Sequence, residues 1–251
     1  MSFFERGGYI GKSVTYPGTN IVMDGLVLYL DAGDVESYPG TGSTWTDLSS
    51  EGNDATSSGS PLFSTNYFTF DGAVDQFNVA TAYTTVTDNF TYSVWARPTA
   101  THEIDTESNS TTTGTSGQKY LIRPVLTDNT SPYDDAGAGI SCGTNGVSVY
   151  EHTGSYMPPL LVHSATISSS VPTLITVVYT NRQPTLYLNG EFARTGLTSA
   201  KNTVYMRGDG IGWGDYGYFE GSVYHVCYYD RSLSPTEVLQ NYNALRGRFG
   251  L

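Results

Sequence analysis

Three acidic residues at alternating positions are the strongest candidates for catalytic chemistry in this chain. Glu103, Asp105 and Glu107 are separated by single residues, and alternate side chains of a β-strand point to the same face. In a strand the three carboxylates would face a substrate together, and paired carboxylates hydrolyse glycosidic bonds. However, the segment has few β-branched or aromatic residues and leads into a Ser/Thr/Gly-rich stretch. We therefore expect a solvated acidic loop and a protein that is not an enzyme.

The histidines are not spaced for metal binding or catalysis. No HExxH motif is present, and no GxSxG sequence precedes a helix-forming segment. No catalytic role is therefore expected for His102, His152, His163 or His225. His225 alternates with Val223, Cys227 and Tyr229, which predicts a hydrogen-bonded core histidine on the same face as these three residues.

Metal ions have few candidate ligands. Cys142 and Cys227 lack the paired spacing of a zinc site, so we expect two free thiols packed in the interior. Asp71 and Asp75 are close in sequence, but calcium takes about six to eight oxygen ligands. Asp71 is equally suited to forming an Asx turn. We expect no metal or other cofactor, and leave calcium at Asp71 and Asp75 open.

An aromatic cluster follows a glycine-rich segment. Residues 208–214 (GDGIGWG) precede strand-like residues rather than a helix whose N-terminus could hold phosphate, so we expect a turn-rich loop. Trp213, Tyr216 and Tyr218 lie beside Asp215. Because an aromatic ring can stack on the apolar face of a sugar, these four residues are the candidates for glycan binding. Packing at the rim of the fold is the alternative use of the rings.

The composition excludes several classes of protein. The chain has 251 residues with 12 Lys+Arg and 24 Asp+Glu, which gives a net charge of −12. No basic stripe is present, so nucleic-acid binding is excluded. Charged residues make up 14% and aromatic residues 13%, which favours a folded β-rich domain over disorder. The sequence contains no run of about 18 apolar residues, so no membrane helix is predicted. The first residues do not resemble a secretory signal.

Short segments of alternating polarity predict an all-β fold. The first convincing strand covers residues 25–30, and residues 90–96 predict another strand with two unlike faces. One face, directed to the core, carries Phe90, Tyr92, Val94 and Ala96. The other face, which contacts water or a partner, carries Thr91, Ser93 and Trp95. Asn145-Gly146 and Asn189-Gly190 predict two antiparallel hairpins, because this dipeptide suits a type I′ turn.

Only one helix is expected, close to the C-terminus. Ser234 and Glu237 predict a capping box, and Pro235 suits the first helical position. The helix should run to about residues 244–246, with an apolar stripe of Val238, Leu239, Tyr242 and Leu245. Two irregular stretches remain. Residues 99–118 are expected to form a long surface loop, and residues 1–24 an extended N-terminal arm.

An ordered series of motifs resembles the laminin-G-like, concanavalin A-like jelly-roll family. The motifs are residues 25–32 (GLVLYLDA), 38–49, 68–72, 90–98, 186–190, 219–224 and 229–237. More narrowly, the opening and the ending YNALRGRFG resemble laminin-G-like structural proteins of tailed phages, especially marine ones. The resemblance implies a two-sheet antiparallel jelly-roll sandwich over residues 25–251, following the arm. It also implies two sites. One is calcium at Asp71 and Asp75, as in laminin-G-like relatives; the other, from β-glucanases of this fold, has Glu103 as nucleophile, Asp105 modulating it and Glu107 as acid/base.

The phage resemblance predicts a virion structural protein, such as a capsid decoration or cement protein. Its expected location is the virion, and its expected partners are other virion proteins and copies of itself, with no membrane partner. Aromatic and basic residues at the two chain ends contrast with the acidic body and suit an interface. They are Phe3, Phe4, Arg6, Tyr9, Ile10, Lys12, Arg246, Arg248 and Phe249. A lectin-like carbohydrate-binding module for host attachment is the alternative, followed by a divergent glycoside hydrolase. Head or tail position and oligomeric state stay open.

Overall fold

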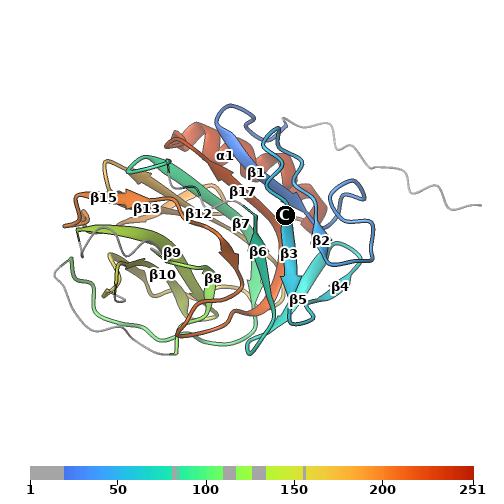
Figure 1. Ribbon diagram of the computed structural model, residues 1–251, viewed down its shortest axis with the longest axis horizontal. Coiled ribbons are helices and arrows are strands. Elements are labelled where there is room, and N and C mark those ends of the chain that lie inside the picture. The colour runs from blue at the N-terminus through green and yellow to red at the C-terminus, as the bar shows by residue number, and fades with distance from the viewer. Residues whose placement is uncertain (1–19, 81–82, 84, 110–116, 126–133, 155–156) are drawn as a thin grey trace, which may run out of the picture.

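The structure, a computed structural model, describes residues 20–80, 83, 85–109, 117–125, 134–154 and 157–251. These residues form two β-sheets, a short helix and a 3-10 turn (Figure 1). Nearly all strand pairs are antiparallel, which confirms the predicted all-β sandwich. Across these ranges, no helix has the length and apolar character needed to cross a lipid bilayer.

Sheet A has eight strands, and its centre is the long strand β17. In spatial order it contains β14 (Glu191–Thr195), β13 (Gln183–Leu188), β12 (Thr173–Thr180), β7 (Phe90–Pro98), β17 (Glu220–Tyr229), β5 (Tyr67–Asp71) and β4 (Leu62–Ser64). One further strand, β1 (Leu26–Asp31), pairs with the second half of β17. The predicted first strand and the predicted strand at residues 90–96 are therefore both present, next to the same partner.

Sheet B has nine strands and faces sheet A. In spatial order it contains β11 (Leu161–His163), β10 (Gly146–His152), β9 (Asp135–Gly143), β8 (Tyr120–Ile122), β16 (Gly210–Ile211), β6 (Gln76–Val79), β3 (Ala55–Ser58) and β2 (Thr44–Trp45). The ninth strand, β15 (Thr203–Tyr205), pairs with β9 in parallel. The short strand β16 lies within the segment that the sequence predicts as a turn-rich loop.

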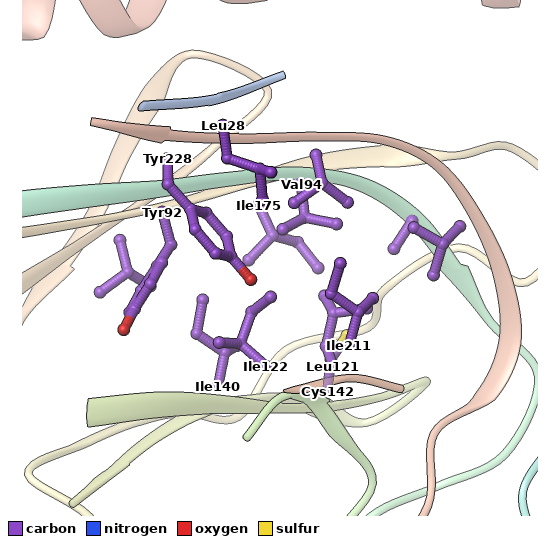
Figure 2. Packing of buried hydrophobic residues seen from close by; sticks show 14 of the residues in the cluster. Leu28, Tyr92, Val94, Leu121, Ile122, Ile140, Cys142, Ile175, Ile211 and Tyr228 are labelled. Atoms are coloured by element: carbon purple, nitrogen blue, oxygen red, sulfur yellow. The ribbon is translucent and has the colours of Figure 1, made fainter. Parts of the chain in front are cut away.

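The core lies between the two sheets. In Figure 2, side chains of Leu28, Tyr92, Val94, Ile175 and Tyr228 extend from sheet A towards Leu121, Ile122, Ile140, Cys142 and Ile211 of sheet B. All of these side chains are fully buried. Both cysteines are buried free thiols, as predicted. Because each strand alternates its side chains, this single layer of contacts fixes which residues face outwards from each sheet.

The helix α1 (Pro235–Leu245) and the 3-10 turn η1 (Arg246–Phe249) cover the outer face of sheet A. The predicted capping box at Ser234 and Glu237 is present. The Trp95 ring packs against Tyr242 at 5.7 Å and Phe249 at 4.5 Å between ring centroids. Trp95 is thereby fully buried. The face of β7 that carries Trp95, which the sequence predicts to contact water or a partner, therefore packs against α1 of the same chain. Figure 1 shows the resulting order of layers: α1, sheet A, sheet B.

The prediction that His225 shares a strand face with Val223 is wrong, because a β-bulge lies between the two residues. The β17–β7 register shifts between Val223 and His225, so Val223 packs in the core between the sheets, whereas Cys227 packs on the outer face below α1. His225 contacts Cys227, with Nε2 3.7 Å from Sγ. Burial lowers the pKa of His225 to about 4. The histidine is therefore buried as predicted, but it does not share a face with Val223.

The two hairpins are also confirmed. Asn189 and Gly190 connect β13 to β14 and have φ angles of 52° and 82°, the left-handed values that a type I′ turn requires. The other hairpin connects β9 to β10, with Gly143 paired to Gly146. Its two loop residues are Thr144 and Asn145, one position earlier than the Asn-Gly pair.

Candidate functional site

The predicted glycan-binding residues lie on one loop between β16 and β17, residues 212–218, which we call the Trp213 loop. Its backbone is attached to the neighbouring strand β8, because Gly212 N–H donates to the Leu121 carbonyl at 3.0 Å. The loop closes on itself where Phe219 N–H donates to the Gly212 carbonyl at 2.9 Å. Tyr218 forms a further backbone bridge with Tyr120. The loop is therefore held at both ends by sheet B.

Glycines allow this loop to lie directly against its neighbours. A Cβ atom on Gly217 would overlap the Gln118 carbonyl, and one on Gly214 would overlap the Tyr120 ring. Gly212 has a φ of +83°, a value that side-chain-bearing residues rarely adopt. The glycine-rich sequence thus has a structural purpose here: it brings Trp213 and its neighbours close to β8.

Arg123, which directly follows β8, completes the cluster. Its guanidinium carbon lies 3.9 Å from the centre of the Trp213 ring, a cation–π contact. Its Nη2 lies 3.6 Å from Oδ1 of Asp215. The sequence analysis missed Arg123 because no local pattern connects it with the loop. Pairing of Ile122 with Ile211, which joins β8 to β16, brings the two segments together.

A second ion pair lies at the other end of β8. Lys119 Nζ, just before this strand, lies 3.1 Å from Oε2 of Glu220, just after the loop. In both pairs the carboxylate is the more exposed partner. The side chains of Asp215 and Arg123 are 50% and 15% exposed, and those of Glu220 and Lys119 are 40% and 22% exposed.

The aromatic members of the Trp213 loop differ in accessibility. Tyr216 is 48% exposed, whereas Trp213 and Tyr218 are half-buried. Nearby, burial lowers the pKa of His152 to about 4 despite the opposing charge of Asp215, so this imidazole is neutral at pH 7. The loop thus presents one accessible phenol, one partly accessible indole and a carboxylate, a set that offers both stacking and hydrogen bonding.

The acidic segment of Glu103, Asp105 and Glu107 is not a strand. Asp105 Oδ2 accepts hydrogen bonds from the Tyr150 hydroxyl at 2.6 Å and from Gln118 Nε2 at 2.9 Å. The expectation of a solvated acidic loop is therefore wrong for Asp105, which anchors the segment to sheet B.

Glu107 is anchored as well. It pairs with Arg194 at 2.6 Å, and its Oε1 accepts the Val162 N–H at 2.6 Å. Two glycines of β9 allow other segments to lie directly against this strand. A Cβ atom on Gly143 would overlap His102, and one on Gly139 would overlap Pro124. Residues 101–109 therefore cover the outer face of sheet B, so this part of the predicted surface loop at residues 99–118 packs on the sheet.

The candidate calcium residues Asp71 and Asp75 accept hydrogen bonds from backbone amides. Asp71 Oδ1 accepts N–H groups of Ala73 at 2.8 Å and Val74 at 3.0 Å, and these bonds lower the pKa of its carboxyl group. Asp75 accepts the N–H groups of Ser60 and Asp71. This is the Asx-turn alternative. In the part of the chain that the structure covers, no three His, Cys, Asp or Glu side chains gather as a metal site.

The predicted interface residues at the C-terminus make contacts within the chain. Arg248 donates two hydrogen bonds to Asp31, at 2.6 Å and 2.9 Å, and Phe249 packs on Trp95. Arg246 is exposed. Six further interface candidates lie outside the described residues: Phe3, Phe4, Arg6, Tyr9, Ile10 and Lys12. Their role as interface residues stays a prediction.

The N-terminal segment enters the described structure beside α1. Gln240 Nε2 donates to the Asn20 carbonyl, and Val22 N–H donates to Asn241 Oδ1, both at 2.8 Å. Ile21 and Val22 are buried in the apolar cluster below α1. The last residues of the predicted arm therefore pack on the domain, on the side of sheet A that α1 covers.

Comparisons with known proteins agree on the fold. The laminin G family model described as the concanavalin A-like lectin/glucanases superfamily matches residues 71–239. Among solved structures, the binding domain of Paraclostridial Mosquitocidal Protein 1 has a TM-score of 0.59 at 16% identity, covering 88% of this chain and 52% of that one. Trypanosoma rangeli sialidase has a TM-score of 0.59 at 15% identity, covering 88% and 33%.

A third similar structure concerns botulinum neurotoxin type C, whose cell entry is dependent upon interaction with two ganglioside molecules. Its TM-score is 0.58 at 14% identity, covering 88% of this chain and 51% of that one. The chain thus spans about half or less of each of these proteins, and at such identities the likeness shows the fold alone. No curated protein sequence matches the chain.

Proposed function

The chain belongs to the concanavalin A-like lectin/glucanases superfamily, and from this premise we propose that it is a carbohydrate-binding module that uses the Trp213 loop. The carrying observation is that Tyr216, Trp213 and Asp215 share one loop hydrogen-bonded to sheet B, and that Arg123, next to β8, contacts Trp213 and Asp215. Aromatic rings pack against the C–H face of a sugar, while guanidinium and carboxylate groups bond to its hydroxyls. The rigid backbone lowers the entropic cost of binding.

The similar structures add support for binding to cell-surface molecules. One is the binding domain of a mosquitocidal protein, another concerns a neurotoxin whose cell entry is dependent upon interaction with two ganglioside molecules, and the third is a sialidase. Gangliosides carry sugar head groups. Their relevance to this chain is an argument from fold, which is weaker than the argument from the loop.

We propose that glycans bind without turnover. The supporting observation is that Asp105 and Glu107 are bound by protein groups and do not form one row with Glu103. Most glycosidases use two carboxyl groups that flank the same glycosidic bond. Incubation with laminarin and agarose oligosaccharides should release no shorter product. Turnover that disappears in Glu103→Gln or Glu107→Gln would contradict this.

A glycan array with four proteins tests the binding function. The wild type should bind a defined subset of glycans, and Tyr216→Ala and Trp213→Ala should each lose at least about tenfold in affinity, since aromatic contacts dominate such sites. Phe192→Ala is the matched control, because Phe192 is an exposed aromatic residue (63%) on β14 in sheet A. Equal loss in all three variants would contradict a site at the Trp213 loop, as would binding unchanged by the two loop substitutions.

We propose attachment to a virion as the second candidate function, because the order of layers separates the N-terminal end from the candidate loop. Asn20 and Val22 contact α1 on the outer side of sheet A, whereas the Trp213 loop is attached to sheet B. A module anchored through its N-terminal end would therefore keep its loop accessible. Deleting residues 1–19 should abolish co-sedimentation with the source particle and leave a cooperatively folded domain. Wild-type occupancy of the truncated protein would contradict attachment through this segment.

A further inference from the structure

The acidic and basic side chains around the Trp213 loop differ in their exposure to solvent. Two basic residues flank β8, and each pairs with an acidic residue: Arg123 with Asp215, between Trp213 and Tyr216, and Lys119 with Glu220, just after the loop. Arg123 lies against the Trp213 ring, and its side chain is 15% exposed. The side chains of Asp215 and Glu220 are 50% and 40% exposed, against 15% and 22% for their basic partners Arg123 and Lys119. A ligand that approaches the loop therefore meets carboxylates first.

This arrangement favours hydroxyl groups and disfavours anions. A carboxylate accepts hydrogen bonds and cannot donate them, so Asp215 and Glu220 suit the hydroxyls of an uncharged sugar. A sugar acid would place a second negative charge beside them, and like charges about 4 Å apart in water repel by about 1 kcal/mol, a factor of about five in affinity. The net charge of −12 acts in the same direction.

We propose that the ligand of the Trp213 loop is a neutral glycan, and that sugars bearing a carboxylate are rejected. This inference rests on the proposed carbohydrate-binding function and specifies its ligand class. A hexose ring packs on Tyr216 and on the accessible edge of Trp213, and its hydroxyls donate to Asp215. Arg123 contributes by fixing Trp213 and Asp215 in place, and its side chain is less accessible to a ligand than the side chain of Asp215.

Matched pairs of oligosaccharides test the inference. Galactose and galacturonate oligomers differ only at C6, as do glucose and glucuronate oligomers and mannose and mannuronate oligomers. Binding of the full chain is measured by calorimetry at about 20 mM and about 500 mM NaCl. In the pair that binds, the neutral member should bind at least about fivefold more tightly at low salt. The difference should shrink at high salt, because ions screen exposed charges.

Two variants separate local charge from total charge. Asp215→Asn should reduce the preference for the neutral oligomer, while Glu191→Gln should leave it unchanged, because Glu191 is exposed on β14 in the other sheet. Tighter binding of the uronate member, lost in Tyr216→Ala, would overturn the neutral-glycan inference and leave the carbohydrate-binding function intact. Binding of no oligomer or array glycan would overturn both.

Discussion

The guanidinium group of Arg123 lies 3.9 Å from the centre of the Trp213 ring and also pairs with Asp215. One side chain therefore orients both the stacking group and the hydrogen-bonding group of the candidate site. A planar guanidinium can do both at once, whereas the compact ammonium of lysine cannot.

This relationship predicts the result of replacing Arg123. Arg123→Lys keeps the positive charge but loses the planar contact, so glycan affinity should fall about three- to tenfold, corresponding to about 1 kcal/mol. The midpoint of thermal unfolding should change little. Calorimetric titration beside a melting curve measures both quantities. Full affinity in Arg123→Lys would contradict an orienting role for Arg123.

Gly217 should not tolerate a side chain. A Cβ at this position would overlap the Gln118 carbonyl, so Gly217→Ala should displace the loop and lower the free energy of unfolding by about 1–3 kcal/mol. Gly42→Ala is the control, since Gly42 has open space around it and a φ of +102°, which leaves only backbone strain. Urea unfolding compares the two variants, and an equal or smaller loss for Gly217→Ala would contradict the close approach.

Glu151 predicts a pH-dependent stability. This fully buried residue of β10 accepts hydrogen bonds from Ser199 Oγ at 2.6 Å and from the Tyr179 hydroxyl at 3.4 Å. Burial raises the pKa of Glu151 from its usual 4.5 to about 7. The folded state thus holds the proton more tightly than the unfolded state, so the stabilisation is complete below pH 4.5. It is lost as pH rises to about 7.

The corresponding variant is Glu151→Gln, which mimics the protonated form. Relative to wild type, its free energy of unfolding should improve between pH 4.5 and pH 8 by about 3 kcal/mol, the equivalent of the pKa difference. Urea unfolding at these two pH values, with Glu191→Gln as the exposed control, gives the answer. A difference between Glu151→Gln and wild type that is constant with pH would show that Glu151 does not titrate in this range.

Arg248 and Arg246 should differ sharply in their effect on stability. Burial would raise the pKa of Asp31, but hydrogen bonds from Arg248 hold that pKa below its usual value. Arg248→Ala would leave the carboxylate of Asp31, which is 5% exposed, without its cation, and the free energy of unfolding should fall by about 3–5 kcal/mol near pH 7. The loss should shrink as pH falls through the folded-state pKa of Asp31.

Arg246→Ala is the matched control because Arg246 is exposed, and surface substitutions usually change stability by about 0.5 kcal/mol or less. Chemical unfolding at pH 7 and pH 3 compares the two arginine variants. Equal effects at pH 7 would contradict the structural role of Arg248. A reduced binding to particles in Arg246→Ala alone would support the interface prediction for the C-terminus.

The sequence predicted the features that depend on neighbouring residues. The Asn189-Gly190 hairpin and the capping box at Ser234 are local, because a turn or a helix end is specified within a few residues. The aromatic residues of the Trp213 loop were found for the same reason. By contrast, Arg123 joins the site only through the pairing of β8 with β16, which no local pattern specifies.

Other features depend on the sheets as a whole. The bulge between Val223 and His225 shifts the alternation of faces along β17 by one residue, without any sequence signal. The covering of sheet B by residues 101–109 includes a close approach of His102 to Gly143 in β9, and the contact of Asp105 with Tyr150 forms in that arrangement. Alternation within a strand predicts two faces, as for Trp95, but it does not reveal that α1 covers one of them.

The tryptophan indole signals test the central claim most directly. Trp45 and Trp95 are fully buried, whereas Trp213 is half-buried on the candidate loop, and these are the three tryptophans of the chain. In a ¹⁵N-labelled protein each indole N–H gives one resonance, and Trp213→Phe identifies that of Trp213 by its disappearance. Titration with the neutral oligosaccharide that binds most tightly should shift the Trp213 resonance in a saturable manner and leave the other two unchanged. Saturable binding of that glycan with an unshifted Trp213 resonance would contradict carbohydrate recognition at this loop.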